Sequence, residues 1–138
     1  MLKRYVLIAA TLLIAATGYA KSGEKTVVIP VNRIDPTDAK LMYTNYCAAC
    51  HGADGRGHGP LAGALSSSPT DLTTLAKTHG GRYPESHVIS VLSFGKEEKD
   101  AVMPAWGHVF ATLNAVSMQD RVLRISNLTR YLRTMQVK

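Results

Sequence analysis

The sequence predicts an all-α fold, and three observations support this prediction. Apolar residues recur at the three- and four-residue spacing of a helix face near the C-terminus. Helix-start or helix-stop residues border the main apolar segments after residue 34. No stretch after that point has the length and apolar character of a buried strand. We therefore expect a small helical domain whose helices are joined by loops rich in glycine and proline.

The first helix is predicted to begin at Asp35 and to carry a cysteine pair at its end. Asp35 can cap the helix, Pro36 suits the first helical position, and Asp38 lies in the electropositive first turn. The helix should then run through Tyr46 and present residues 47–50 at its C-terminal end.

Loops and two helices are predicted for the middle of the chain. Residues 52–63 contain five glycines and a proline, which favours tight turns, and residues 66–69 continue this loop. A short helix is expected over residues 71–78, and a firmer one over residues 84–94, ended by Gly95. The inner side of this firmer helix is predicted to carry Val88, Ile89, Val91 and Leu92.

The last helix is predicted to start at a capping box formed by Ser117 and Asp120. One of its faces is apolar, and arginines occupy the others, which is the pattern of a helix packed on a core. The apolar face should comprise Val122, Ile125, Leu128, Leu132 and Met135, with Arg121, Arg124, Arg130 and Arg133 elsewhere.

The first 20 residues have the pattern of an export signal. Lys3 and Arg4 precede an apolar run over residues 5–16, and Gly18 and Ala20 supply the small residues of a cleavage site. The run is shorter than the ~20 residues that a membrane-spanning helix needs. We therefore predict a cleaved signal peptide over residues 1–20, an extended arm over residues 21–34 and one domain over residues 35–138. Retention of the first segment as a membrane anchor is the alternative.

The chain has a formal net charge of +6, which falls to +4 once the two basic leader residues, Lys3 and Arg4, are removed. This balance suits acidic protein partners or an anionic surface, whereas an exported protein is not expected to meet nucleic acid. Export also implies oxidising surroundings, so Cys47 and Cys50 should be bridged, metallated or alkylated.

Both cysteines of the chain lie in the motif Cys47-Ala-Ala-Cys50-His51. A zinc site needs four ligands, commonly from a second close pair, but the other four histidines are scattered singly. A thioredoxin-like dithiol belongs in a βαβ setting, and a disulfide across two residues closes a loop too small to stabilise much. The motif favours C-x-x-C-H attachment of a c-type haem, with a disulfide or chance spacing as the alternative.

Haem attachment gives each residue of this motif a chemical role. Two thiols one helical turn apart can each add to a vinyl group on one edge of the porphyrin, and His51 then lies under the iron as an axial ligand. Its second ring nitrogen needs an acceptor, which we expect to be a carbonyl of the glycine-rich loop that ends at Pro60. Trp106, the only tryptophan, either packs near the ring with its N–H toward a propionate or a backbone carbonyl, or fills the core.

Met103 is predicted to be the sixth iron ligand. It lies 52 residues after His51, in a non-helical stretch held by Pro104 that can cross the opposite face of the ring. A methionine thioether paired with a histidine suits electron transfer and raises the reduction potential. The alternative is ligation by a second histidine, for which the candidates are His79, His87 and His108.

Four features together resemble the small single-haem cytochromes c of the soluble, His/Met-ligated bacterial class. They are Y-x-x-Y-C-A-A-C-H-G at residues 43–52, G-x-G-P at 57–60, M-P-A-W-G at 103–107, and the amphipathic last helix. The resemblance implies a cytochrome c fold in which the first and last helices pack together around the haem. It also implies thioether bonds at Cys47 and Cys50, axial ligands His51 and Met103, and a Pro60 carbonyl beside the His51 ring.

A less diagnostic part of the resemblance covers residues 80–84, where Arg82 or Tyr83 is expected to contact a propionate. As a whole, the resemblance implies a periplasmic single-electron carrier with one covalent haem c and no catalytic residues. Its partners would be a dehydrogenase, a reductase or a terminal oxidase with acidic docking patches. The alternatives are a haem enzyme, a gas or peroxide sensor with a displaceable distal ligand, and a tightly bound subunit of a larger oxidoreductase. Membrane association is expected only if the signal segment is retained.

Overall fold

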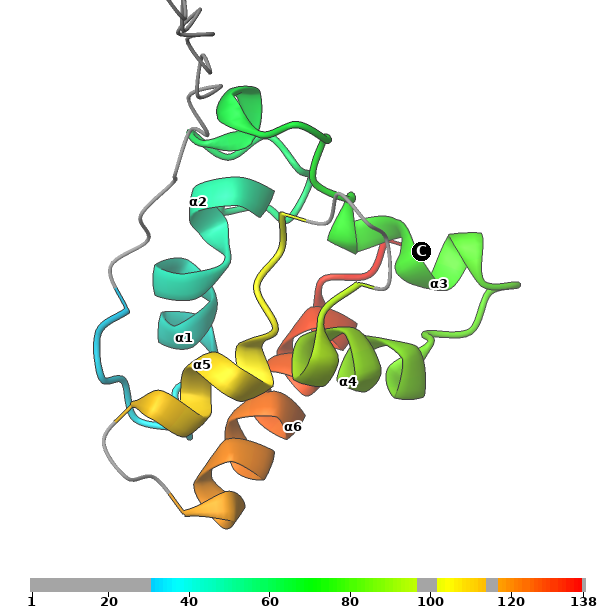
Figure 1. The fold of residues 1–138 in the computed structure, drawn as a ribbon. Helices are drawn as coiled ribbons and strands as arrows, with labels where there is room; N and C mark the ends of the chain where they lie inside the picture. Colours follow the sequence, from blue (N-terminus) through cyan, green and yellow to red (C-terminus); the bar gives the residue numbers. More distant parts are fainter. Residues whose placement is uncertain (1–30, 97–101, 114–116, 138) are drawn as a thin grey trace, which may run out of the picture.

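The computed structural model describes residues 31–96, 102–113 and 117–137 of the chain. Their regular structure is entirely helical, which confirms the predicted all-α fold (Figure 1). The helices are α1 (Ala39–Tyr46), α2 (Ala48–His51), α3 (Leu75–Thr78), α4 (Glu85–Phe94), α5 (Trp106–Thr112) and α6 (Met118–Thr134), with two 3₁₀ turns, η1 (Ala62–Ala64) and η2 (Leu72–Thr74). The predicted signal peptide and most of the predicted arm lie outside the described residues.

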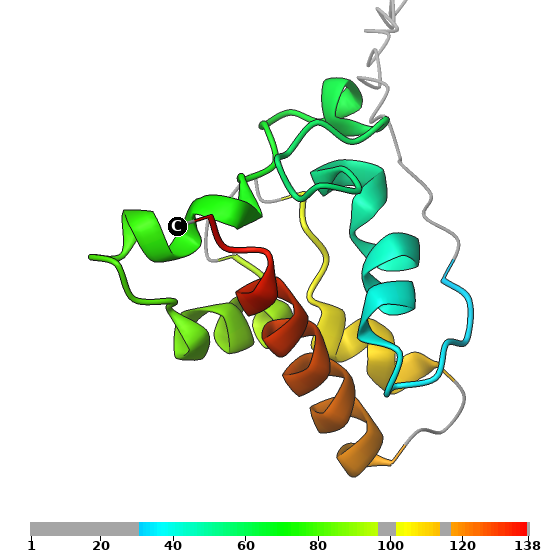
Figure 2. The same ribbon diagram turned by 180° about the vertical axis from the view of Figure 1, so that it is seen from behind.

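The first and last helices pack together, as predicted. α6 contacts α1, α4 and α5, and Figure 2 shows it crossing the back of the molecule between α1 and α4. Tyr43 of α1 meets Tyr131 of α6 with ring centroids 5.4 Å apart. No helix in the described part of the chain has both the length and the apolarity needed to cross a membrane.

α1 begins later than predicted and is separated from the cysteine motif. The cap is Asp38, whose side chain accepts a hydrogen bond from the Leu41 N–H, whereas Asp35 accepts from the N–H and hydroxyl of Thr37. Asp35 thus closes a turn ahead of the helix, which delays its first residue to Ala39. Cys47 ends α1 and precedes the single turn of α2, so the predicted continuous helix is two helices.

α5 was not predicted, because a proline and a short length obscure it in the sequence. It begins directly after Pro104 and Ala105 and buries Trp106 and Phe110. These two rings and that of Tyr46 form an aromatic cluster, with centroid separations of 5.5 to 5.6 Å. The cluster joins α5 to α1 beneath the cysteine motif.

The predicted inner faces of α4 and α6 are wrong at two positions. Ile89 is 39% exposed and Val122 is 58% exposed. Ile89 follows the buried Val88 in the chain. Val122 belongs to the N-terminal turns of α6, which extend beyond the other helices in Figures 1 and 2. Periodicity finds the apolar stripe, but it does not show where neighbouring helices stop covering it.

Arg124 is the second correction to α6, because it is buried rather than on a solvated face. Its side chain is 3% exposed and its Nε donates to Asp120 at 2.9 Å. Its Nη1 lies 3.8 Å from the Met42 sulfur, and its guanidinium lies 5.8 Å from the centre of the Phe110 ring. The arginine therefore ties α6 to α1 and α5 while its charge is balanced by a carboxylate one turn away.

Candidate haem site

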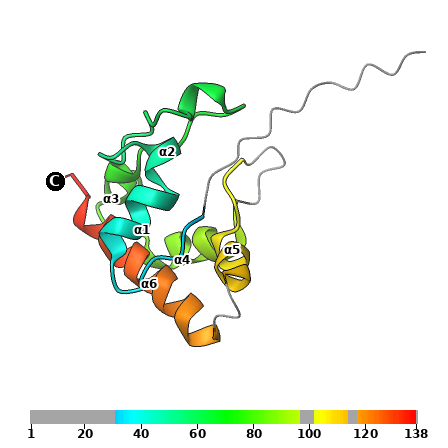
Figure 3. The same ribbon diagram turned by 90° about the vertical axis from the view of Figure 1, so that its left-hand side faces the viewer.

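The cysteine motif and the methionine segment face one cavity. Its empty space, counted together with the open mouth, is about 850 Å³. Figure 3 shows the segment before α5 rising toward α2, and residues of both line the cavity. The lining residues are Tyr46, Cys47, Cys50, His51, Leu65, Ser67, Ser68, Pro69, Thr70, Lys96, Val102, Met103, Pro104 and Trp106.

α2 places the two thiols and His51 on the cavity wall. Cys47 and Cys50 are free cysteines, one helical turn apart, and they form no disulfide with each other. Burial raises the pKa of the Cys47 thiol to about 12 and also raises the pKa of Cys50. Both side chains are therefore neutral thiols. Among the described residues, no group of three or more histidine, cysteine, aspartate or glutamate side chains comes together in a way that could hold a metal ion.

The orientation of His51 is fixed by a backbone carbonyl. Its Nδ1 lies 2.9 Å from the carbonyl oxygen of Thr70. A carbonyl only accepts, so Nδ1 carries the proton and Nε2 keeps its lone pair. Burial lowers the pKa of His51, which favours this neutral form. This is the outer-sphere arrangement that prepares a histidine to bind a metal through its other nitrogen.

The prediction that the Pro60 carbonyl accepts the hydrogen bond from the His51 ring is wrong. Pro60 is exposed, and the N–H groups on either side of it face α2: Gly59 donates to the Cys50 carbonyl at 3.0 Å, and Leu61 donates to the Ala49 carbonyl at 2.9 Å. The glycine-rich loop thus uses its donors to cap the C-terminal end of α2. The acceptor for His51 comes from the next passage of the chain, at Thr70.

Two glycines let this loop lie between α2 and the Thr70 segment. A Cβ at Gly59 would lie 2.4 Å from the Ala49 carbonyl oxygen, and one at Gly57 would lie 2.4 Å from the Pro69 carbonyl oxygen. Gly57 also has φ +85, a conformation that favours glycine. The predicted G-x-G-P element therefore serves close backbone packing.

The C-terminal tail holds the chain that follows Thr70. Gln136 accepts a hydrogen bond from the Ala76 N–H at 2.9 Å and donates to the Leu72 carbonyl at 2.7 Å. Val137 donates its N–H to the Thr73 carbonyl at 2.9 Å. Residues 70–76 are thus fixed from both the glycine loop and the end of α6.

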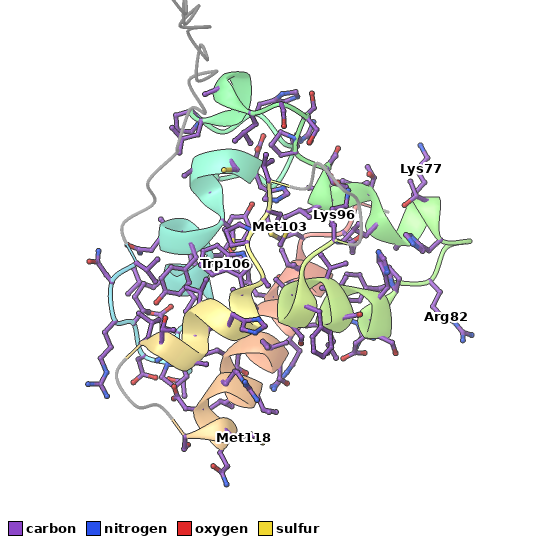
Figure 4. All side chains as sticks on the ribbon, in the orientation of Figure 1. Lys77, Arg82, Lys96, Met103, Trp106 and Met118 are labelled. Atoms are coloured by element: carbon purple, nitrogen blue, oxygen red, sulfur yellow. The ribbon has the colours of Figure 1, made fainter. Side chains whose placement is uncertain are left out.

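Met103, from the segment before α5, and Trp106, the first residue of α5, also line the cavity (Figure 4). Met103 is half-buried and packs against the core, and Trp106 is 3% exposed with its ring 5.5 Å from that of Tyr46. Trp106 is therefore a core residue that also lines the cavity, and the contact of its N–H with a propionate or a backbone carbonyl stays a prediction. His79, His87 and His108 are exposed and do not line it.

Neither predicted propionate partner lines the cavity. Arg82 is exposed and points away from the cavity in Figure 4, and the Tyr83 hydroxyl donates to the Thr129 carbonyl at 2.9 Å. Lys96 supplies a cationic side chain to the lining instead. Neither Lys96 nor Ser67 was predicted, because both reach the cavity through the path of the loops that carry them.

These residues fit a c-type haem. A flat, largely apolar ring matches a cavity bounded by Leu65, Val102, Met103 and Trp106. Two neutral thiols lie at one edge, and beside them His51 has an available Nε2 lone pair. Soft sulfur and imidazole donors also suit iron in such a site.

Comparison with known proteins agrees with this chemistry. Residues 35–120, which are more than half of the chain, match the family described as cytochrome c oxidase, cbb3-type, subunit III. No curated protein matches. Among solved structures, the chain is similar to a chain of the reducing HAO-like protein complex of Kuenenia stuttgartiensis, with 22% identity and a TM-score of 0.45. That match covers 76% of this chain and 45% of the other, so the present chain spans less than half of it.

The family match covers the cysteine motif, the glycine loop, the methionine segment and the start of α6. It confirms the predicted c-type cytochrome and the covalent haem c that this family implies, for which Cys47, Cys50 and His51 provide the attachment motif. The chain therefore belongs to the c-type cytochrome family described as cbb3-type cytochrome c oxidase subunit III, whose domain performs haem-based electron transfer.

Proposed function

We propose that this protein is an exported single-electron carrier in which His51 and Met103 are the axial ligands of one haem c. The observation that carries the proposal is that both residues line the same cavity, His51 from α2 and Met103 from the segment before α5, with Cys47 and Cys50 also in its lining. One imidazole and one thioether are the axial pair expected for an electron-transfer haem.

When bound, haem c supplies an iron that accepts and releases one electron. The chain's own residues hold the ligands still while this occurs. The Thr70 carbonyl fixes the tautomer of His51, and Pro104 restrains the backbone next to Met103. The rings of Tyr46 and Trp106 line the cavity and pack against each other, and an apolar surrounding influences the potential.

Redox proteins with acidic docking patches are the proposed partners. A formal net charge of +6, or +4 without the leader cations Lys3 and Arg4, favours such encounters. The attraction should weaken with salt, because at 0.1 M ionic strength two exposed charges more than about 10 Å apart are largely screened from each other. Such partners include a dehydrogenase, a reductase or a terminal oxidase. The export pattern of residues 1–20 supports a periplasmic location.

Replacement of Met103 tests the proposed sixth ligand. In Met103→Ala the methionine-to-iron charge-transfer band of the oxidised protein should disappear and the reduction potential should fall, because the thioether is lost. Met118→Ala is the matched control, since Met118 is 68% exposed at the far end of α6 (Figure 4). A band that is missing from the wild type, or that survives in Met103→Ala, would exclude Met103 as the ligand.

Carbon monoxide separates the carrier from the alternative, a haem enzyme or sensor. If Met103 remains bound, the reduced wild-type protein should bind carbon monoxide slowly, whereas Met103→Ala should bind it quickly. Rapid binding by the wild type would favour a displaceable distal ligand and contradict the carrier.

A tightly bound subunit of a larger oxidoreductase is the second candidate, and the description of the family as an oxidase subunit favours it. Gel filtration of the protein from its native source separates the two. Elution near the mass of one chain supports a diffusing carrier, whereas co-elution with an oxidase or dehydrogenase supports a subunit.

A further inference from the structure

Two histidines outside the haem cavity lie next to each other on the surface. His79 ends α3 and His87 lies in the first turn of α4. Their ring centroids are 5.8 Å apart and their planes are inclined by 34°. Gly80 and Gly81, at φ +65 and φ +82, make the turn that brings the two together. Both side chains are exposed, so solutes can reach them.

The His79 ring is held in one tautomer. Its Nδ1 lies 2.8 Å from the Leu75 carbonyl oxygen and 3.1 Å from the Thr78 hydroxyl. A carbonyl only accepts, so Nδ1 carries the proton and the lone pair is on Nε2. A backbone carbonyl that orients the second nitrogen is the usual support of a metal-bound histidine.

The separation of the two rings matches that of two imidazoles on one ion. Each metal–nitrogen bond is about 2.0–2.1 Å long, and two such bonds at a tetrahedral angle leave the ring centroids roughly 5–6 Å apart. The observed 5.8 Å lies within this range. The two ring planes are inclined by 34°, so the rings do not form a parallel stack.

The imidazole ligands of the pair favour a borderline cation over a hard one. Lys77 and Arg82 point outward in Figure 4, and the carboxylate of Glu85 is paired with Arg133 at 2.9 Å. Ca²⁺ and Mg²⁺ need several oxygen ligands, whereas imidazole suits Zn²⁺, Cu²⁺ and Ni²⁺.

From this geometry we propose that His79 and His87 together bind one borderline divalent cation of the Zn²⁺ type, with water completing its coordination. The ion joins the end of α3 to the start of α4 across the Gly80–Gly81 turn. It therefore stabilises the folded chain by mass action. The site is separate from the haem cavity and does not depend on the identity of the sixth iron ligand.

Calorimetric titration of the untagged, haem-loaded protein with ZnCl₂ at neutral pH tests the site. The wild type should bind one Zn²⁺ per chain and should unfold at a higher temperature in its presence. His79→Gln and His87→Gln should each weaken binding about tenfold or more and abolish the thermal shift. MgCl₂ should give no binding heat, because this site lacks the oxygen ligands that Mg²⁺ requires.

His58→Gln and His108→Gln are the matched controls, since both residues are exposed single histidines, and both variants should bind Zn²⁺ like the wild type. An unchanged haem spectrum and an unchanged metal-free unfolding temperature establish that each variant is folded. Absence of Zn²⁺ binding by the wild type would overturn the proposal. So would binding that survives in both His79→Gln and His87→Gln.

Discussion

His51 is positioned by main-chain groups rather than by another side chain. The Thr70 carbonyl accepts a hydrogen bond from its Nδ1–H, and the Gly57 N–H donates to the His51 carbonyl at 2.8 Å. The Tyr43 hydroxyl donates to the carbonyl of the next residue, Gly52, at 2.7 Å. Because these acceptors are backbone atoms, the ligand depends on how closely the chain segments approach one another.

Gly59 offers a direct test of that dependence. In Gly59→Ala the new Cβ would meet the Ala49 and Ala48 carbonyl oxygens at 2.4 and 2.6 Å, so the loop must move away from α2. We expect a loss of about 1–3 kcal/mol in the free energy of unfolding, measured by denaturant titration of the haem-loaded protein. Gly63→Ala is the control, because a Cβ there has no atom within 4 Å. Equal stability of the two variants would contradict this account.

α5 meets α4 at a position where only glycine fits. A Cβ at Gly107 would lie 2.4 Å from the Ser93 carbonyl oxygen. The preceding residue is Trp106, which lines the haem cavity. The crossing of these two helices therefore sets the depth of the tryptophan in the site.

The sign of the stability change in Gly107→Ala tests this crossing. In an open helix, alanine in place of glycine stabilises by about 1 kcal/mol. Here we expect destabilisation of about 1–3 kcal/mol, because α5 must shift away from Ser93. The reverse change at the exposed Ala111 of α5, Ala111→Gly, measures the difference in helix propensity alone. It should lower the free energy of unfolding by about 1 kcal/mol. A more stable Gly107→Ala protein would show that α5 can move without strain.

The molecule as a whole is arranged around the cavity. Its walls come from α2, from residues 65–70 and from residues 102–106, and Figure 1 shows these segments converging from different parts of the fold. A cofactor bound there contacts all of them at once. Haem c therefore contributes to the stability of the domain as well as to its chemistry.

Replacement of the two cysteines that attach the haem tests this contribution to stability. Cys47→Ser combined with Cys50→Ser leaves no thiol for attachment, since these are the only cysteines of the chain. We expect the purified, haem-free protein to unfold at a lower temperature and over a broader range, measured by circular dichroism at a helix wavelength. Cys50→Ser alone keeps one thiol and should be intermediate. A double variant as stable as the wild type would show that the walls hold without the cofactor.

The parts of this fold that depend on local chemistry could be predicted from the sequence. The attachment motif, the glycine loop, α4 and α6 each have a signal within a few residues, and so does the segment of Met103. The acceptor for His51 could not be predicted, because any carbonyl of the chain can accept and Thr70 is selected by packing. Arg124 was missed for a similar reason, since its burial depends on Asp120 and on the space beside Met42.

The residues that line the cavity with His51 lie at different distances from it along the chain. The hydrogen bond from His51 to Thr70 joins residues 19 apart, whereas Met103 lies 52 residues from His51. Contacts close in sequence form early in folding, and distant ones form later. During biogenesis, the thiols and His51 should therefore be in place while the Met103 segment is still open. The order of assembly would then leave an entrance for the cofactor, which the methionine closes last.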